Sequence, residues 1–144
     1  MKYFLPFIKI LMIFNVFILP SCKTNKAAFD PTTTKKDFIT FGNGGGITGQ
    51  VKKYFFTYEG EIYIHEIDSI KLINTIPSKT STQIFGSYLK LSLDKNILNE
   101  PGNLYYFLEM KSKDVNHALK WGRNDLHNPN IEKYYNVLMN LVKQ

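Results

Sequence analysis

The 144-residue chain contains one cysteine, one arginine and one tryptophan, and two of these scarcities exclude whole classes of protein. A single cysteine cannot build an internal disulfide framework or a cysteine-based zinc site. Arg123 is the one arginine among 18 basic residues, whereas proteins that read nucleic acids usually depend on arginine for bidentate contacts to phosphate and guanine. We therefore expect no nucleic-acid partner, although the formal net charge is +6.

The chain also lacks the motifs of common hydrolases and metalloenzymes. It has no GxSxG sequence and no recognisable pair of catalytic acids. His65, His117 and His127 are the only imidazoles, and none has an i,i+4 partner or an HExxH context. The sequence therefore predicts a protein that is not an enzyme and that uses neither a metal nor another cofactor.

One apolar run is long enough to matter, from Ile10 to Leu19, and only Asn15 interrupts it. About ten helical residues rise about 15 Å, half the thickness of a hydrocarbon core, so this run suits a signal peptide better than a transmembrane helix. Leu19-Pro20-Ser21-Cys22 follows and resembles the lipobox of bacterial lipoproteins. The resemblance implies that residues 1–21 are a signal peptide and that Cys22 receives a diacylglycerol thioether and an N-acyl chain.

The residues after the cysteine extend this prediction to a location. Lys23 stands where many lipoproteins retained in the inner membrane have aspartate, and no acidic run resembling a surface-export signal follows. We therefore expect a lipid anchor in the outer membrane, with the protein facing the periplasm. Residues 23–36 are polar and aperiodic, so residues 22–36 are predicted to be the lipidated cysteine and a flexible tether with a reach of about 20 Å.

Residues 37–144 are predicted to form one α+β domain. Segments rich in aromatic, β-branched or alternating apolar residues indicate strands over residues 37–41, 50–58, 61–67, 104–111 and 117–121, the second and third forming a hairpin. Helical spacing of apolar residues favours helices over residues 81–93 and 131–142, the latter capped by Asn128 and Pro129. The expected fold is a small, mostly antiparallel sheet packed against two helices, in the order β-β-β-α-β-β-α.

Five of the nine glycines lie within FGNGGGITG, residues 41–49. The spacing formally matches GxGxxG, but a dinucleotide site needs a helix next, and the following residues indicate a strand. A P-loop is excluded because Gln50 and Val51 stand where lysine and serine or threonine are required. Two interpretations remain: a tight connection between strands, or a loop that enters a partner's cleft backbone-first, made of Gly44, Gly45, Gly46, Ile47, Thr48 and Gly49.

The aromatic residues of the C-terminal half also allow two interpretations. They could form a ligand platform, but their spacing favours an interface between the sheet and the last helix; they are Tyr105, Tyr106, Phe107, Trp121, Tyr134 and Tyr135. Glu109 lies in the same predicted strand and is expected to be partly buried, with Lys120 of the neighbouring strand as its partner.

The glycine segment and the elements after it resemble a known family. GGITG at residues 45–49, the hairpin, the later strand pair and the C-terminal helix look like emfourin-type inhibitors, small proteins that inhibit thermolysin-like zinc metalloproteases. Ile47 stands where these inhibitors usually have phenylalanine, and residues 68–100 form an extra stretch. FGNGGG, NEPGNLYYF, the Trp121-Gly122 pair and the closing helix are also similar to a group of Bacteroidetes lipoproteins.

The resemblance implies a lipid-anchored envelope binding protein that inhibits or regulates a thermolysin-like metalloprotease, with the loop Gly44–Gly49 in its cleft. The alternative is a structural or accessory lipoprotein that docks on an outer-membrane assembly through its aromatic residues and inhibits nothing. A third interpretation, small-ligand binding, requires an apolar cavity between sheet and helices.

Overall fold

The computed structural model describes residues 28–122 and 128–143. Within these residues the strands are β1 (Phe38–Gly45), β2 (Val51–Thr57), β3 (Glu61–Glu66), β4 (Ser69–Thr75), β5 (Asn99–Glu100), β6 (Leu104–Lys111) and β7 (Asn116–Gly122). The α-helices are α2 (Ser78–Lys90) and α3 (Pro129–Val142), and a single 3-10 turn, η1 (Leu93–Lys95), follows α2.

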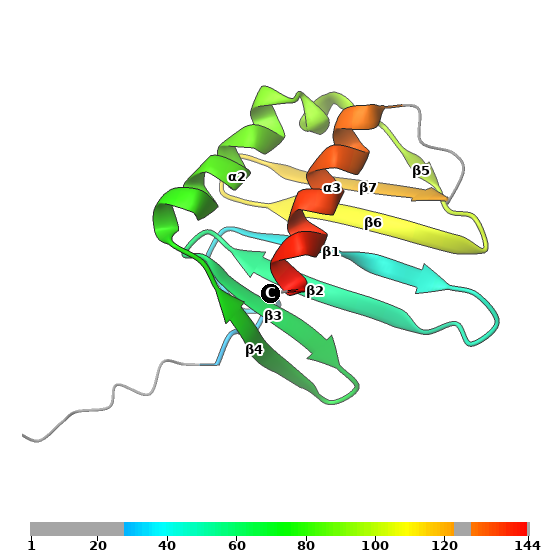
Figure 1. The fold of residues 1–144 in the computed structure, drawn as a ribbon, viewed down its shortest axis with the longest axis horizontal. Helices are drawn as coiled ribbons and strands as arrows, with labels where there is room; N and C mark the ends of the chain where they lie inside the picture. Colours follow the sequence, from blue (N-terminus) through cyan, green and yellow to red (C-terminus); the bar gives the residue numbers. More distant parts are fainter. Residues whose placement is uncertain (1–27, 123–127, 144) are drawn as a thin grey trace, which may run out of the picture.

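The strands form one sheet in the order β4-β3-β2-β1-β6-β7-β5, and both helices lie on the same face of it (Figure 1). Neighbouring strands are antiparallel except β5 and β7, which are parallel. The predicted α+β class, a mostly antiparallel sheet packed against two helices, is therefore confirmed. No helix among the described residues is long and apolar enough to cross a bilayer.

The sheet is larger than the small one predicted, and the order of elements differs because β4 and β5 are additional. In β4 the pairing register shifts opposite Ile62 and Tyr63, so Ile73 is an extra residue that breaks the period of two. β5 has only two residues, too few to give a pattern. The strand predicted over residues 37–41 continues to Gly45, and the helix predicted over residues 81–93 spans Ser78–Lys90 instead.

The hydrophobic core fills the space between the sheet and the two helices. Inward-facing residues of the central strands are each at most 7% exposed: Ile39, Phe41, Tyr54, Phe56, Leu108, Met110, Leu119 and Trp121. The Asn128 side chain accepts a hydrogen bond from the Asn130 N–H at 3.0 Å, and Pro129 occupies the first turn of α3, which confirms the predicted cap. The Tyr134 hydroxyl joins the two helices by donating to the Ile84 carbonyl at 3.0 Å.

The predicted aromatic interface is confirmed for four of its six residues. Tyr106, Trp121 and Tyr135 contact one another with ring centroids 5.5–5.9 Å apart, and Tyr134 is 3% exposed. The two others, Tyr105 and Phe107, alternate with these along β6 and point to the opposite face.

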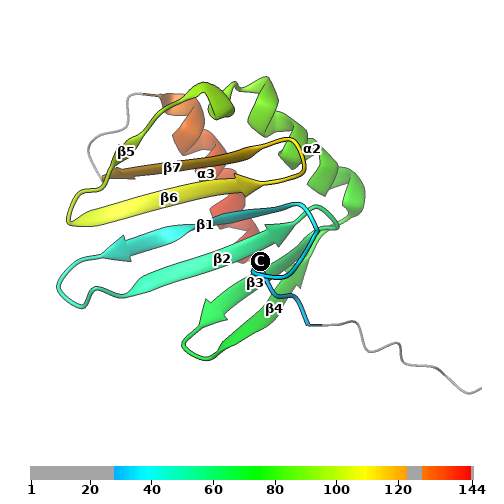
Figure 2. The ribbon, with the colours of Figure 1, turned by 180° about the vertical axis from the view of Figure 1, so that it is seen from behind.

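Residues 28–36 lie against the end of the sheet where β1 begins (Figure 2). The Phe29 ring stacks on Tyr63 with centroids 4.7 Å apart and contacts Phe38 and Phe55 at 5.6 and 5.5 Å. These residues belong to the tether predicted over 22–36. The rest of that tether, Cys22 and the predicted signal peptide lie outside the described residues.

Candidate functional site

The glycine-rich segment is divided between a strand and a turn. Gly44 and Gly45 are the last residues of β1, with Gly44 opposite Val51 of β2 and Gly45 opposite Leu104 of β6. Residues 46–50 form the connection to β2. The Gly46 N–H donates to the Asn103 carbonyl at 2.8 Å, so the start of the turn is attached to the chain that enters β6. The predicted loop is thus a short hairpin turn with a strand-paired base.

Backbone geometry explains why glycines lie here. Gly45, Gly46 and Gly49 have φ angles of 95°, 75° and 62°, in the region that side chains disfavour. The Gly49 N–H also donates to the Gly46 carbonyl at 3.2 Å and closes the turn. The backbone of the turn therefore favours glycine at these three positions, because a side chain there would be strained.

Ile47 is fully exposed at this turn. Val51 and Leu104 lie at the base of the turn and are 46% and 44% exposed. We call these three residues the apolar tip. Val51 pairs with Gly44 and Leu104 of β6 pairs with Gly45, so Val51 and Leu104 point to opposite faces of the sheet and flank the exposed Ile47 from its two sides.

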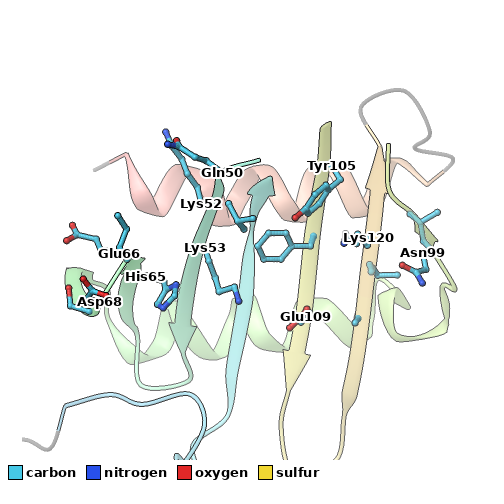
Figure 3. A pocket seen from close by; sticks show the side chains of 17 residues that line it. Gln50, Lys52, Lys53, His65, Glu66, Asp68, Asn99, Tyr105, Glu109 and Lys120 are labelled. Carbon is cyan, nitrogen blue, oxygen red and sulfur yellow. The ribbon is translucent and has the colours of Figure 1, made fainter. Parts of the chain in front are cut away.

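The other face of the sheet carries no helix in the described part of the chain, and a groove of about 1280 Å³ lies on it (Figure 3). The groove is lined by parts of β2, β3, β5, β6 and β7 and by the β3–β4 turn. The groove therefore lies outside the helix–sheet interface, where small-ligand binding would require an apolar cavity. Polar side chains around it include Lys53, His65, Glu109 and Lys120.

Glycines of β1 explain why aromatic rings form part of this face. A Cβ atom at Gly42 would lie 2.8 Å from the Phe107 ring and 1.9 Å from the Lys52 carbonyl oxygen. A Cβ atom at Gly44 would lie 2.7 Å from the Tyr105 hydroxyl oxygen. The Phe107 and Tyr105 rings occupy space above β1 that a side chain at position 42 or 44 would otherwise fill. No local pattern in the sequence indicates this role, because it depends on the pairing of β1 with β6.

The strand register aligns several of these residues in one row across the sheet. Successive partners are His65, Lys53, Gly42, Phe107, Lys120 and Asn99, and we call this set the lysine row. The Lys120 Nζ lies 4.1 Å from the centroid of the Tyr105 ring, a cation–π contact. Among the ion pairs of the described residues, none involves Lys53 or Lys120.

The predicted pairing of Glu109 with Lys120 is wrong. Glu109 lies opposite Ala118, while Lys120 lies opposite Phe107 and over Tyr105. Glu109 is also exposed rather than partly buried.

The buried carboxylate is Glu61, which is 9% exposed and accepts a hydrogen bond from the Tyr63 hydroxyl at 3.1 Å. Lys36 Nζ lies 3.7 Å from the same carboxylate. Burial, followed by this hydrogen bond, raises the pKa of Tyr63 to about 12. The arrangement is that of a structural ion pair at the edge of the N-terminal segment.

The two histidines in the described part of the chain, His65 and His117, do not converge. His65 is exposed on the helix-free face, whereas His117 faces the helices, with Nδ1 2.7 Å from the Tyr88 hydroxyl and Nε2 2.8 Å from the Asn96 carbonyl. Because a carbonyl only accepts, Nε2 carries a proton, and in the neutral imidazole Nδ1 then accepts from the Tyr88 hydroxyl. His127 lies outside the described residues, and within them no three His, Cys, Asp or Glu side chains are grouped as metal ligands.

No protein-family model matches the chain, and no curated protein matches its sequence. Its class is therefore defined by architecture: a two-layer α+β domain with both helices on one face of the sheet, a groove on the other, and an apolar hairpin tip at one end.

Proposed function

We propose that this chain is a lipid-anchored, non-catalytic binding protein of a bacterial cell envelope that inhibits a thermolysin-like metalloprotease. The observation that carries the proposal is the position of Ile47, fully exposed between Gly46 and Gly49 on the β1–β2 turn. The turn is built to present one apolar side chain to a cleft.

The paired base of the hairpin reduces the conformational entropy that the turn loses when it binds a partner. β1 pairs with β2 on one side and with β6 on the other, and the Gly46 N–H is bonded to Asn103. A loop that is ordered before it binds loses less conformational freedom on association. The same pairing holds the backbone beside the turn in the sheet, which opposes its cleavage by a protease.

Inhibition of this kind works by occupying the cleft. Residues 46–50 offer one apolar side chain, one hydroxyl and one amide, with no histidine, cysteine or carboxylate that would ligate zinc strongly. The chain would therefore displace substrate and leave the metal of the protease in place.

The arrangement of the domain suits an anchor at Cys22. Residues 28–36 lie at the end of the sheet where β1 begins, and the β1–β2 turn lies at the opposite end (Figure 1). A lipid attached before residue 28 would leave the apolar tip directed away from the bilayer, toward soluble partners.

The test is an inhibition assay with the mature chain expressed without its lipid and thermolysin-like proteases as targets. We expect inhibition at micromolar concentration or below, and we expect Ile47→Asp to weaken it by at least about tenfold, equivalent to about 1.4 kcal/mol of binding free energy. Ile97→Asp is the matched control, because Ile97 is also fully exposed but lies in the loop before β5. Unchanged proteolysis at micromolar protein, or equal effects of both variants, would contradict the proposal.

The accessory-lipoprotein alternative depended on the aromatic residues as a contact surface. Four of these six residues pack in the helix–sheet interface instead. Cross-linking in cells separates the two functions, because an accessory protein would be captured with a stable membrane partner and no protease.

A further inference from the structure

We propose that the helix-free face is a second binding surface, which holds an extended acidic polypeptide segment along the lysine row. This inference goes beyond the apolar tip and does not depend on protease inhibition.

The first support is the charge of the outward side chains. Within the described strands β1, β2, β6 and β7, the outward positions carry three lysines and one carboxylate: Lys53, Lys111, Lys120 and Glu109. The remaining outward residues of these strands are uncharged. The lining of the whole groove also includes Lys52 and two carboxylates at its β3–β4 edge, Glu66, which pairs with Lys71, and Asp68. The excess of lysine is therefore local to the row between β2 and β7, where it attracts an anionic group.

The second support is spacing. Lys53 and Lys120 are three strands apart in the row, about 14 Å at the usual distance between neighbouring strands. An extended polypeptide rises about 3.3 Å per residue, so side chains four residues apart lie about 13 Å from each other on one side of it. Two acidic residues at positions i and i+4 therefore match the two lysines.

The third support is what lies between the lysines. Gly42 contributes no side chain there, and Phe107 contributes a ring. The side chain at position i+2 of an extended segment would lie over these two residues, where an apolar group fits. The recognised pattern is thus acidic, any, apolar, any, acidic.

The lysines are already positioned for such contacts. Lys53 and Lys120 are half-buried, and the cation–π contact with Tyr105 restrains Lys120. Neither has a carboxylate partner among the described residues, so an incoming acidic group replaces water and not an existing ion pair. Figure 3 shows Lys53 and Lys120 on opposite sides of the groove.

Glu109 defines where the segment lies. It occupies the next outward position along β6 from Phe107, one row toward the start of β1. A carboxylate there repels acidic side chains and so confines them to the lysine row. Removing this charge should therefore strengthen binding, the opposite of the effect at either lysine.

The probe is a fluorescein-labelled ten-residue peptide with the central sequence Glu-Ser-Leu-Ser-Glu and glycine-serine flanks. Its control replaces both glutamates with lysine. Fluorescence anisotropy with the non-lipidated mature chain should show binding of the acidic peptide only, weakening as salt is raised. Lys53→Glu and Lys120→Glu should each weaken binding by about tenfold, and Glu109→Gln should strengthen it about threefold.

Lys79→Glu is the matched control, because Lys79 is exposed on α2 and lies on the helix side of the sheet. Melting temperatures of all variants verify that each is folded. Equal binding of the two peptides, no binding at millimolar protein, unchanged binding by Lys53→Glu, or preferential binding of a sulfated oligosaccharide would each overturn the proposal. Ile47→Asp should leave peptide binding unchanged. The peptide-binding test can therefore fail while the inhibition test succeeds, and the reverse.

Discussion

At the scale of single residues, the glycines of this chain have unequal roles, and the structure separates them by what a side chain would meet. A Cβ atom at Gly42 would be 1.9 Å from the Lys52 carbonyl oxygen, so the backbone itself would have to move. At Gly86, in the middle of α2, no heavy atom lies within 4 Å of the added carbon.

Gly42→Ala should therefore destabilise the protein, by about 2–4 kcal/mol, because overpacking against backbone cannot be relieved by a change of rotamer. Gly86→Ala should stabilise it by up to about 1 kcal/mol, because alanine favours the helix. Urea denaturation of the two variants measures both effects. Equal stability of Gly42→Ala and the wild type would show that the Lys52 carbonyl oxygen does not lie this close to residue 42.

Tyr63 gives a prediction about pH. Its pKa is raised to about 12 by burial and by the bond to Glu61, so the folded state keeps the phenol protonated at pH values where the unfolded chain begins to lose it, near 10. The stabilisation is fully present below pH 10 and is lost as the pH rises toward 12.

Tyr63→Phe should remove this part of the alkaline loss of stability, so the difference in unfolding free energy between variant and wild type should change between pH 9 and pH 11.5. Urea unfolding at several pH values measures it. Burial also raises the pKa of Tyr88, Tyr134 and Tyr135, so some alkaline loss persists in the variant. A pH-independent difference between the two proteins would contradict the assignment.

At the scale of elements, the start of α3 depends on Asn128. Its side chain accepts from the Asn130 N–H and donates to the Asn96 side chain at 2.9 Å, so it both caps the helix and attaches it to the segment after η1. Asn128→Ala should cost about 1–2 kcal/mol of stability. Asn136→Ala, at an exposed position within the same helix, should cost nothing, because alanine is the better helix former. Thermal unfolding of the pair distinguishes a cap from a general effect of losing asparagine.

Elements with a regular period could be predicted from the sequence, and elements without one could not. β2, β3, β6 and α3 have apolar residues at the spacing that their burial requires, so local pattern and final structure agree. The end of β1 has glycines in place of a pattern, and it is a strand because β2 and β6 pair with it on both sides. The bulge at Ile73 hides β4 in the same way, by shifting the period halfway.

The apolar tip and the lysine row also differ in whether a local sequence pattern indicates them. The glycine cluster indicated the loop Gly44–Gly49, which contains Ile47, but it gave no signal for Val51 or Leu104, the other members of the apolar tip. The lysine row takes one residue from each of several strands, and its members are brought together by register alone. No single stretch of the sequence contains a signal for it.

At the scale of the whole molecule, the domain has two ends with different roles. Phe29 attaches residues 28–36 to the sheet near the start of β1, and the apolar tip lies at the far end. If Cys22 carries the lipid, only residues 23–27 separate it from the folded body, a contour length of roughly 17 Å. The body would thus be held close to the bilayer with its tip directed outward.

This arrangement depends on lipidation of Cys22, which gives the last prediction. In the native host, the wild-type protein should incorporate radiolabelled palmitate, lose residues 1–21 and fractionate with the outer membrane, because three acyl chains bind a bilayer effectively permanently. Cys22→Ser should incorporate no palmitate and be absent from the outer-membrane fraction. The non-lipidated mature chain carrying the same substitution should inhibit a susceptible protease as well as the wild type does, because the apolar tip lies at the other end of the domain. Equal palmitate labelling of the two proteins would contradict the anchor, and loss of inhibition by Cys22→Ser would contradict the separation of the two ends.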